Sequence, residues 1–332
     1  MKKSFLLMAL LCATMLVFAQ NSTQTALLQH GDETTTFYGA DAFINAHAAA
    51  TAGDIITLSS GTFNTPRELT KPITLRGVGC VTDDELNIHS TTIAGDIIVS
   101  CGGDANQHLT VEGIFFNGTF KTNGFEFPVF IRCNFHTIDR FQSEYGGRMT
   151  DAEFINCRIK SFRLSTNMNN LTFRNCAVFG MGDVWENETA SAISAYNSFL
   201  WLDDAHRQLS AYNSLISGSG PTGNSVAYNC IGWGGVLNGC ETHGCWVFMS
   251  NGEVFETFNY GVYDWTTEPL LLKAEIQNQC VGPDGTQVGI YGGNMPYATR
   301  PTYMTPYRTT VGQHSTPDGK LNIHIEVIDG NK

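Results

Sequence analysis

Charged residues are scarce in this chain. Asp, Glu, Lys and Arg make up 15% of its 332 residues, well under the ~25% that is usual for globular domains. The formal net charge is -12, and no stretch gathers Lys and Arg into a cluster. We therefore expect no nucleic acid among the partners, and a strongly acidic polysaccharide only where a metal ion bridges the two.

Long apolar runs are also missing, apart from one at the very beginning. Lys2 and Lys3 precede an apolar run from Phe5 to Phe18, with Gln20 as the expected first residue after cleavage. This arrangement is typical of a secretory signal peptide, and no later stretch has the ~18 uninterrupted apolar residues of a membrane helix. We expect a secreted protein without membrane insertion, in the periplasm, at the cell surface or outside the cell.

Familiar catalytic signatures are absent too. The sequence has no Ser/His/Asp arrangement, no phosphate-binding loop and no helical zinc motif. Gly (34) and Phe (21) are abundant instead, which indicates many turns and a large core.

A short repeat is the strongest pattern in the sequence. Aligned units place small residues in one column, namely Gly113, Cys133, Cys157, Cys176, Ser198, Ser214 and Cys230. The column before it holds Glu112, Arg132, Asn156, Asn175, Asn197, Asn213 and Asn229. Successive members lie 16 (Ser198 to Ser214) to 24 residues (Cys133 to Cys157) apart, which is one coil of a solenoid with loops of variable length.

Each unit alternates in and out with period two, and the alternation breaks at the asparagine. In the unit from Leu171 to Val178, Leu171 and Phe173 face inward, then Cys176 and Val178 do, with Asn175 between them. Such a break predicts a sharp bend, because Asn tolerates the left-handed backbone region. Stacked at ~4.8 Å, the asparagines Asn156, Asn175, Asn197, Asn213 and Asn229 are expected to form a structural ladder of side-chain amides.

The cysteines fit a packing role better than a disulfide framework. Ten are present, and cleavage of the signal peptide would leave an odd number, nine. Four of them share the repeat column, where buried Cys acts as a small hydrophobe. Only Cys240 and Cys245 are a local pair, for which a disulfide and two free thiols are equally consistent with the sequence.

The chain divides into four segments on this reading. Residues 1–19 are the signal peptide, 20–37 a linker, 38–296 the solenoid, and 297–332 a proline-containing linker followed by a final strand near Leu321–Val327. A helix from Asp41 as N-cap to Gly53 is expected to cover the first coil with Phe43, Ile44 and Ala48.

This pattern resembles a known superfamily. The run from Asp41 through Gly79, followed by the Asn-Cys units, is similar to the pectate-lyase-like right-handed β-helix superfamily, and Pro283–Gly293 resembles the end of exported Bacteroidetes β-helix proteins. The resemblance implies an all-β, single-stranded right-handed parallel β-helix with an N-terminal capping helix and a short C-terminal β tail. It implies little about activity, because the superfamily holds lyases, hydrolases and adhesins.

Superfamily enzymes suggest where chemistry would lie. Lyases of this type use calcium held by carboxylates with a nearby basic residue, so the resemblance makes Asp203, Asp204 and Arg207 the catalytic candidates. Asp183 and Glu186, one coil earlier, could face the same side and bind calcium through oxygen atoms. A polar turn and a solvated loop are the simpler interpretations. Arg158-Ile159-Lys160 matches one pectin-hydrolase element, but its order is wrong and no Gly-His-Gly is present.

Tryptophan supports a binding role. All five tryptophans, Trp185, Trp201, Trp233, Trp246 and Trp265, lie in the second half of the chain. Flat rings suit sugar stacking, so Asp183, Trp185, Glu186 and Trp201 are ligand-binding candidates, although Trp201 and Trp233 follow repeat strands and could simply pack.

Three functions stay open at this point. The first is a non-catalytic, glycan-binding or surface-associated β-helix with polysaccharide as the partner. The second is a polysaccharide lyase or glycoside hydrolase. The third is a structural or adhesive, protein-binding solenoid.

Overall fold

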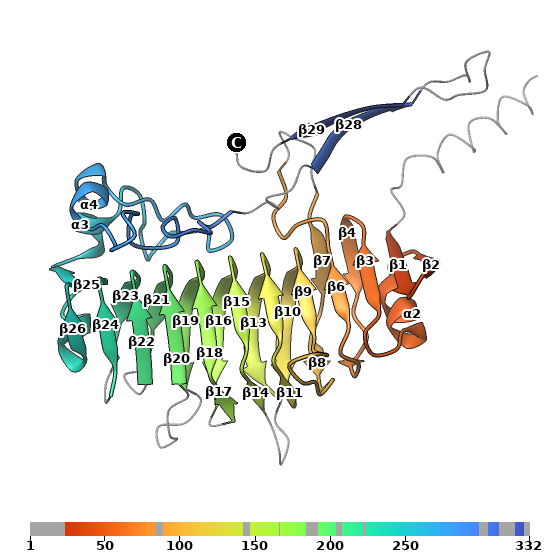
Figure 1. Cartoon of the computed structure of the whole chain (residues 1–332), viewed down its shortest axis with the longest axis horizontal. Helices are drawn as coiled ribbons and strands as arrows, with labels where there is room; N and C mark the ends of the chain where they lie inside the picture. The colour runs from red at the N-terminus through yellow and green to blue at the C-terminus, as the bar shows by residue number, and fades with distance from the viewer. Residues whose placement is uncertain are drawn as a thin grey trace, which may run out of the picture.

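A computed structural model describes residues 24–83, 89–141, 147–165, 167–183, 192–203, 208–221, 224–298, 305–311 and 323–328. The chain winds into a parallel β-solenoid of about nine turns. Figure 1 shows the coils stacked along the long axis, with helix α2 at one end and strand β26 at the other. This confirms the all-β solenoid expected from the repeat.

Each full coil contributes one strand to each of two long sheets, called sheet A and sheet B here. Sheet A has twelve strands in the order β2-β1-β3-β6-β9-β12-β15-β18-β20-β22-β24-β26, parallel from β3 onward. Their bounds are β1 Thr25–His30, β2 Glu33–Tyr38, β3 Ile55–Leu58, β6 Thr74–Arg76, β9 Thr110–Glu112, β12 Val129–Ile131, β15 Glu153–Ile155, β18 Leu171–Arg174, β20 Ala192–Tyr196, β22 Gln208–Tyr212, β24 Val226–Tyr228 and β26 Glu241–His243.

Sheet B also has twelve strands, all parallel to their neighbours. The main path runs β27-β25-β23-β21-β19-β16-β13-β10-β7-β4, with β5 and β8 beside it. Their bounds are β4 Gly61–Asn64, β5 Glu68–Leu69, β7 Thr91–Ala94, β8 Ile97–Val99, β10 Phe115–Thr122, β13 Asn134–Arg140, β16 Arg158–Leu164, β19 Ala177–Asp183, β21 Phe199–Leu202, β23 Leu215–Gly218, β25 Ile231–Trp233 and β27 Trp246–Phe248. A third, three-stranded sheet joins β11 Phe125–Glu126, β14 Met149–Thr150 and β17 Met168–Asn169.

The corner between sheets A and B repeats one backbone conformation. Eight residues there have φ between 47° and 66°, in the left-handed region, namely Gly113, Arg132, Asn156, Asn175, Asn197, Asn213, Asn229 and Gly244. The sequence alignment placed Gly113 one position too late. Glu112 pairs with Ile131, so Gly113 belongs to the corner beside Arg132.

The side-chain amides of the corner asparagines do not form the expected continuous ladder of hydrogen bonds. The Oδ1 atoms of Asn156, Asn197 and Asn213 are buried without a hydrogen-bond partner. The amide of Asn175 instead donates to the carbonyls of Ile290 and Gly292, at 2.9 and 2.7 Å. The asparagines therefore have the same left-handed backbone conformation, but their side chains do not form one continuous ladder.

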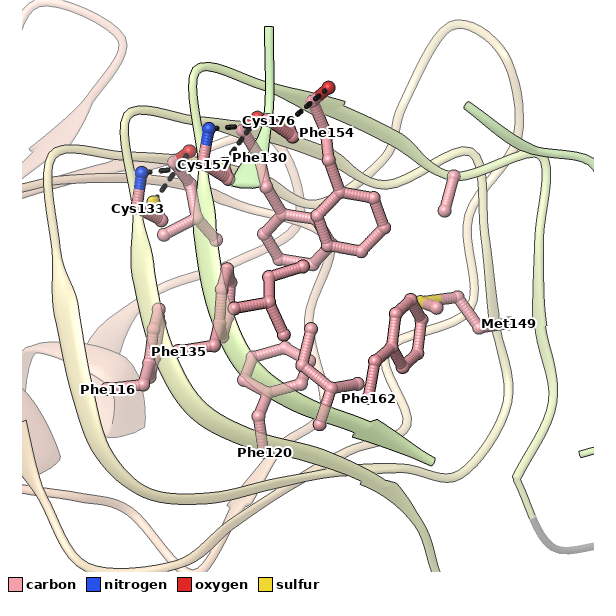
Figure 2. Close-up of a cluster of buried hydrophobic side chains, with 14 of the residues drawn as sticks. Phe116, Phe120, Phe130, Cys133, Phe135, Met149, Phe154, Cys157, Phe162 and Cys176 are labelled. Carbon is pink, nitrogen blue, oxygen red and sulfur yellow. Dashed lines mark hydrogen bonds between the residues drawn. The ribbon is translucent and has the colours of Figure 1, made fainter. Parts of the chain in front are cut away.

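Phenylalanine fills the interior of the middle coils. Phe130, Phe154 and Phe173 stack at 4.9 and 5.0 Å between ring centroids, and Phe116 stacks on Phe135 at 4.9 Å. All five are buried, and Figure 2 shows four of them, Phe116, Phe130, Phe135 and Phe154, in the interior beside the column of Cys133, Cys157 and Cys176. Offset stacking adds about 0.5–1.5 kcal/mol per pair to the burial of the rings.

The inward column beside the corner is a ladder of Cys and Ser. The backbone N–H of Cys133 donates to Sγ of Cys157, that of Cys157 to Sγ of Cys176, and that of Cys176 to Oγ of Ser198. Burial raises the pKa of the Cys133 and Cys157 thiols well above the usual value. These cysteines are packing residues that also accept backbone hydrogen bonds.

Cys245 ends this column and differs from its inner members. It accepts the N–H of Cys230 at 3.4 Å and is half-buried. A hydrogen bond from the Cys230 side chain lowers the pKa of Cys245 to about 6. All nine cysteines of the described residues are free. The Cys240–Cys245 disulfide is therefore absent, because β26 extends between the two positions at ~3.3 Å per residue, and a disulfide needs Cα atoms within about 7 Å.

The N-terminal end of the solenoid is capped. Helix α2 (Ala42–Ala49) has Asp41 as its N-cap residue and buries Phe43 against the first coil. Ile44 is half-buried and Ala48 exposed, so only Phe43 of the three expected residues covers the core fully.

The expected linker at residues 20–37 is wrong in its described part. Strands β1 and β2 form an antiparallel hairpin there, and β1 pairs with β3. The hairpin extends sheet A because Ala26 and Leu28 face the core.

The solenoid stops before the position expected from the sequence. Its last strands are β26 and β27, and the short helix η1 (Val236–Gly239) precedes them. Residues 249–298, called the C-terminal strap here, contain only the helices α3 (Asn251–Val254) and α4 (Ala274–Gln279). The strap turns back along the upper side of the coils in Figure 1.

The tail contains one more strand than expected. Strand β28 (Thr305–Val311) pairs antiparallel with β29 (Ile323–Ile328). Pro306 thus lies in a strand and not in a linker. The expected signal peptide lies outside the described residues. No helix of the described part is long and apolar enough to cross a membrane.

Candidate functional site

The outer face of sheet B is covered by the C-terminal strap. On strands β19, β21, β23 and β25 its outward column holds Ala177, Phe199, Leu215 and Ile231. These residues share one buried cluster with strap residues, among them Val254, Phe255, Phe258, Leu270, Ile276 and Ile290. An apolar outward column would be costly in water, so the strap completes this side of the molecule as a second core.

Arg158 fastens the strap to β16. It is 1% exposed. Its guanidinium donates to the hydroxyl of Tyr297 at 2.9 Å and to the carbonyls of Trp265 and Glu268 at 3.1 and 2.5 Å. It also lies over the ring of Tyr297, 4.8 Å from the centroid. Satisfying a buried cation in this way fixes the strap at a single position.

The corner supplies a second set of strap contacts. The N–H of Gly289 donates to the carbonyl of Asn213 at 2.8 Å. Gly293 has φ of 74°, and a Cβ there would meet Nδ2 of Asn197 at 2.4 Å. Gly293 of the expected closing stretch is therefore explained by its close approach to a corner asparagine.

Strap packing changes the role of the tryptophans. Trp233 is buried and packs edge-on against Phe255 at 5.5 Å. Trp201 is half-buried, with its ring edge-on to Tyr260, whose hydroxyl hydrogen-bonds with Ser217 at 2.6 Å. Trp246 and Trp265 are half-buried against the same cluster. All four take part in the packing between sheet B and the strap. For Trp201 and Trp233 this is the simpler of the two interpretations of the sequence.

The predicted acidic site is described only in part. Asp203 is exposed and directly follows β21. The pKa of Tyr263 is raised, first by burial of its own ring and then by the negative charge of Asp203. Asp183 ends β19 with its backbone beside Leu164, and its side chain is outside the description. Trp185, Glu186, Asp204 and Arg207 also lie outside the described residues. No cluster of three or more metal-ligating side chains occurs within the described ranges, and the structure does not test a calcium site built from these acids.

Sheet A presents a different surface, a ladder of stacked aromatic rings. Tyr196 stacks on Tyr212 at 5.1 Å with 6° between the rings, and Tyr212 on Tyr228 at 5.1 Å with 4°. His243 continues the stack on Tyr228 at 4.6 Å. The three tyrosines are half-buried and face outward, because Ala195, Ala211 and Ala227 occupy the inward positions before them.

The flanks of this tyrosine ladder are polar. Arg174 lies over the ring of Tyr196 at 4.6 Å, and its Nε donates to Oε1 of Glu153 at 2.7 Å. A parallel outward column, two positions earlier on each strand, consists of Thr172, Ser194, Ser210 and Val226. Rows of phenol and alcohol hydroxyls thus repeat at the ~4.8 Å strand spacing.

The tyrosine ladder is a candidate site that the sequence analysis did not predict. Its signal was the triplet Ala-Tyr-Asn, which occurs at residues 195–197, 211–213 and 227–229. In each triplet the tyrosine lies between an inward alanine and the corner asparagine, so it faces outward. An equal register on neighbouring strands necessarily stacks identical side chains.

Comparison with known proteins identifies no relative. No protein-family model, no curated protein and no solved structure matches the chain.

Proposed function

We propose that this chain is an exported, non-catalytic glycan-binding solenoid whose binding face is the tyrosine ladder of sheet A. The observation that supports the proposal is the row of three in-register, half-buried tyrosines beside a row of hydroxyl side chains. The resemblance to pectate-lyase-like β-helices, many of which act on polysaccharides, supports the same class of ligand.

The repeat of the surface favours a polymer. A chain of pyranose units lying along the ladder would meet the same tyrosine ring edge at three successive coils, with a serine hydroxyl beside the first two. Tyrosine offers an apolar ring with a hydroxyl that donates and accepts, and serine adds a second donor and acceptor. With a net charge of -12, the protein favours a neutral polysaccharide over a strongly acidic one.

The test is a binding panel with the mature chain. Neutral glucans, xylans and mannans are compared with pectin in pull-down and calorimetric assays, with and without calcium. We expect binding to at least one neutral polymer and a loss of about tenfold in affinity for Tyr212→Ala, since a buried ring edge contributes roughly 1–2 kcal/mol.

The matched control is Tyr38→Ala. Tyr38 is 67% exposed on β2 and is outside the ladder, so its loss should leave binding unchanged. Equal losses in both variants, or no binding to any polymer, contradict the proposal. New chain ends that vanish with Asp203→Ala would establish the alternative, a polysaccharide-cleaving enzyme.

A further inference from the structure

The C-terminal end of the solenoid is open where the N-terminal end is covered. The inward-facing positions of the last coil are half-buried or exposed, namely Cys240, Thr242, Cys245 and Val247. Val247 is 59% exposed, and Met249, next to this end, is 83% exposed. At the opposite end, Phe43 of α2 is fully buried against the first coil.

Strand β26 lies at this open end with a free edge. The N–H of Glu241 donates to Ser225, and the carbonyl of His243 accepts from Asn229, so residues 241 and 243 bond with the neighbouring coil. In a parallel pair the residue between them directs its N–H and C=O to the other side. Thr242 therefore offers one donor and one acceptor outward, at the last strand of sheet A.

The sequence of this edge is complementary to itself. An antiparallel pairing centred on Thr242 exchanges two N–H···O bonds between equivalent threonines. The same register sets Glu241 of each copy opposite His243 of the other. Within one chain Glu241 Oε1 and His243 Nε2 are already 2.7 Å apart, both exposed. In this register the carboxylate of each Glu241 would accept a hydrogen bond from the imidazole of the opposite His243, which stabilises the pair.

We propose that two copies of this chain associate end to end through β26, about a two-fold axis at Thr242. A second copy is the occupant that this edge fits, because like end meets like end and the open apolar positions Val247 and Met249 become covered on both copies. The N-terminal end is a poor partner, since α2 already closes its core. The resulting contact is isologous and closed, so it gives a dimer and not a fibre.

The experiment is sedimentation velocity of the mature chain over a range of concentrations. We expect a monomer–dimer equilibrium. Thr242→Pro removes the outward N–H at a position where an edge strand tolerates proline, and it should give a monomer with an unchanged far-ultraviolet spectrum.

Charge exchange keeps the test decisive if the proline variant does not fold. His243→Glu alone places two carboxylates opposite one another and should raise the dimer dissociation constant by about tenfold. Adding Glu241→Lys to it sets Lys opposite Glu, which restores opposite charges and should recover the dimer. A monomer at all concentrations, or a dimer unaffected by His243→Glu, would overturn the proposal.

Discussion

The outer faces of sheet A and sheet B are built on the same coils, but the outer face of sheet B is buried and that of sheet A is open to solvent. Outward positions of sheet B hold Phe199, Leu215 and Ile231, and the C-terminal strap buries them. Outward positions of sheet A hold serines and the half-buried tyrosines of the ladder.

The difference lies in the side chains and not in the backbone. Both sheets have twelve strands and share the same corner column. An apolar outward column requires a cover, and a column of tyrosine and serine does not, because its hydroxyls stay hydrated. The scaffold thus sets the spacing, and the outward residues decide which face becomes core and which stays available for binding.

The largest expected change in stability comes from removing an outward aromatic ring of sheet B, and the same change on sheet A serves as the comparison. Phe199 is fully buried among Trp233, Phe255 and Phe258, so Phe199→Ala should lower the free energy of unfolding by about 3–5 kcal/mol. Tyr212→Ala should cost about 1 kcal/mol, because its ring is half-buried. Denaturant unfolding of both variants measures the difference, and equal costs would show that the strap does not make the second core.

A second comparison uses two arginines that each lie over a tyrosine ring. Arg158 is 1% exposed, and Arg158→Met leaves two strap carbonyls and the Tyr297 hydroxyl without this donor. We expect a loss of about 3 kcal/mol and early proteolysis within the strap.

Arg174→Met is the control on sheet A. The Arg174 side chain is 44% exposed in its pair with Glu153, so its loss should cost less than about 1 kcal/mol. Strap cleavage at the wild-type rate in Arg158→Met would refute the fastening role of Arg158.

Alkaline pH should weaken the covered face. Burial raises the pKa of Tyr260 to about 12 from a usual value of 10. A phenol with a raised pKa in the folded state stabilises the fold fully below pH 10, and this contribution is lost as the pH rises through 12. We expect a decrease of about 2 kcal/mol between these values. Tyr260→Phe should show a smaller decrease, and an identical pH profile in the two proteins would contradict the assignment.

The smallest effect concerns the corner that both faces share. Asn156 has φ of 53°. Asn156→Ala should cost roughly 1–2 kcal/mol, because a Cβ without local hydrogen bonding disfavours this region. Asn156→Gly should stay within about 1 kcal/mol of wild type. Thermal unfolding ranks the three proteins, and an alanine variant as stable as the glycine variant would remove the backbone explanation.

The solenoid was predictable from sequence because its information is local and repeated. The phase break at Asn175 recurs in every unit, so one bend explains all of them. The last corner of the solenoid, at Gly244 and Cys245, was not predicted because Gly replaces Asn in the Asn-Cys pattern there.

The strap was not predictable for the opposite reason. Its contacts join residues far apart in the chain, such as Arg158 with Tyr297. It has no repeat and only two short helices, so no periodicity indicates where it docks. Packing of Trp201 and Trp233 was an alternative in the sequence, because both follow repeat strands, but their partners in the strap were not predictable.

The most direct test of the tyrosine ladder as the binding face is hydroxyl-radical footprinting with a bound neutral polysaccharide. The account predicts that oxidation of Tyr196, Tyr212 and Tyr228 falls on binding, while Tyr260, Tyr263 and Tyr291 of the strap are unchanged. Protection of the strap tyrosines with full oxidation of the ladder would place the ligand on sheet B and contradict it.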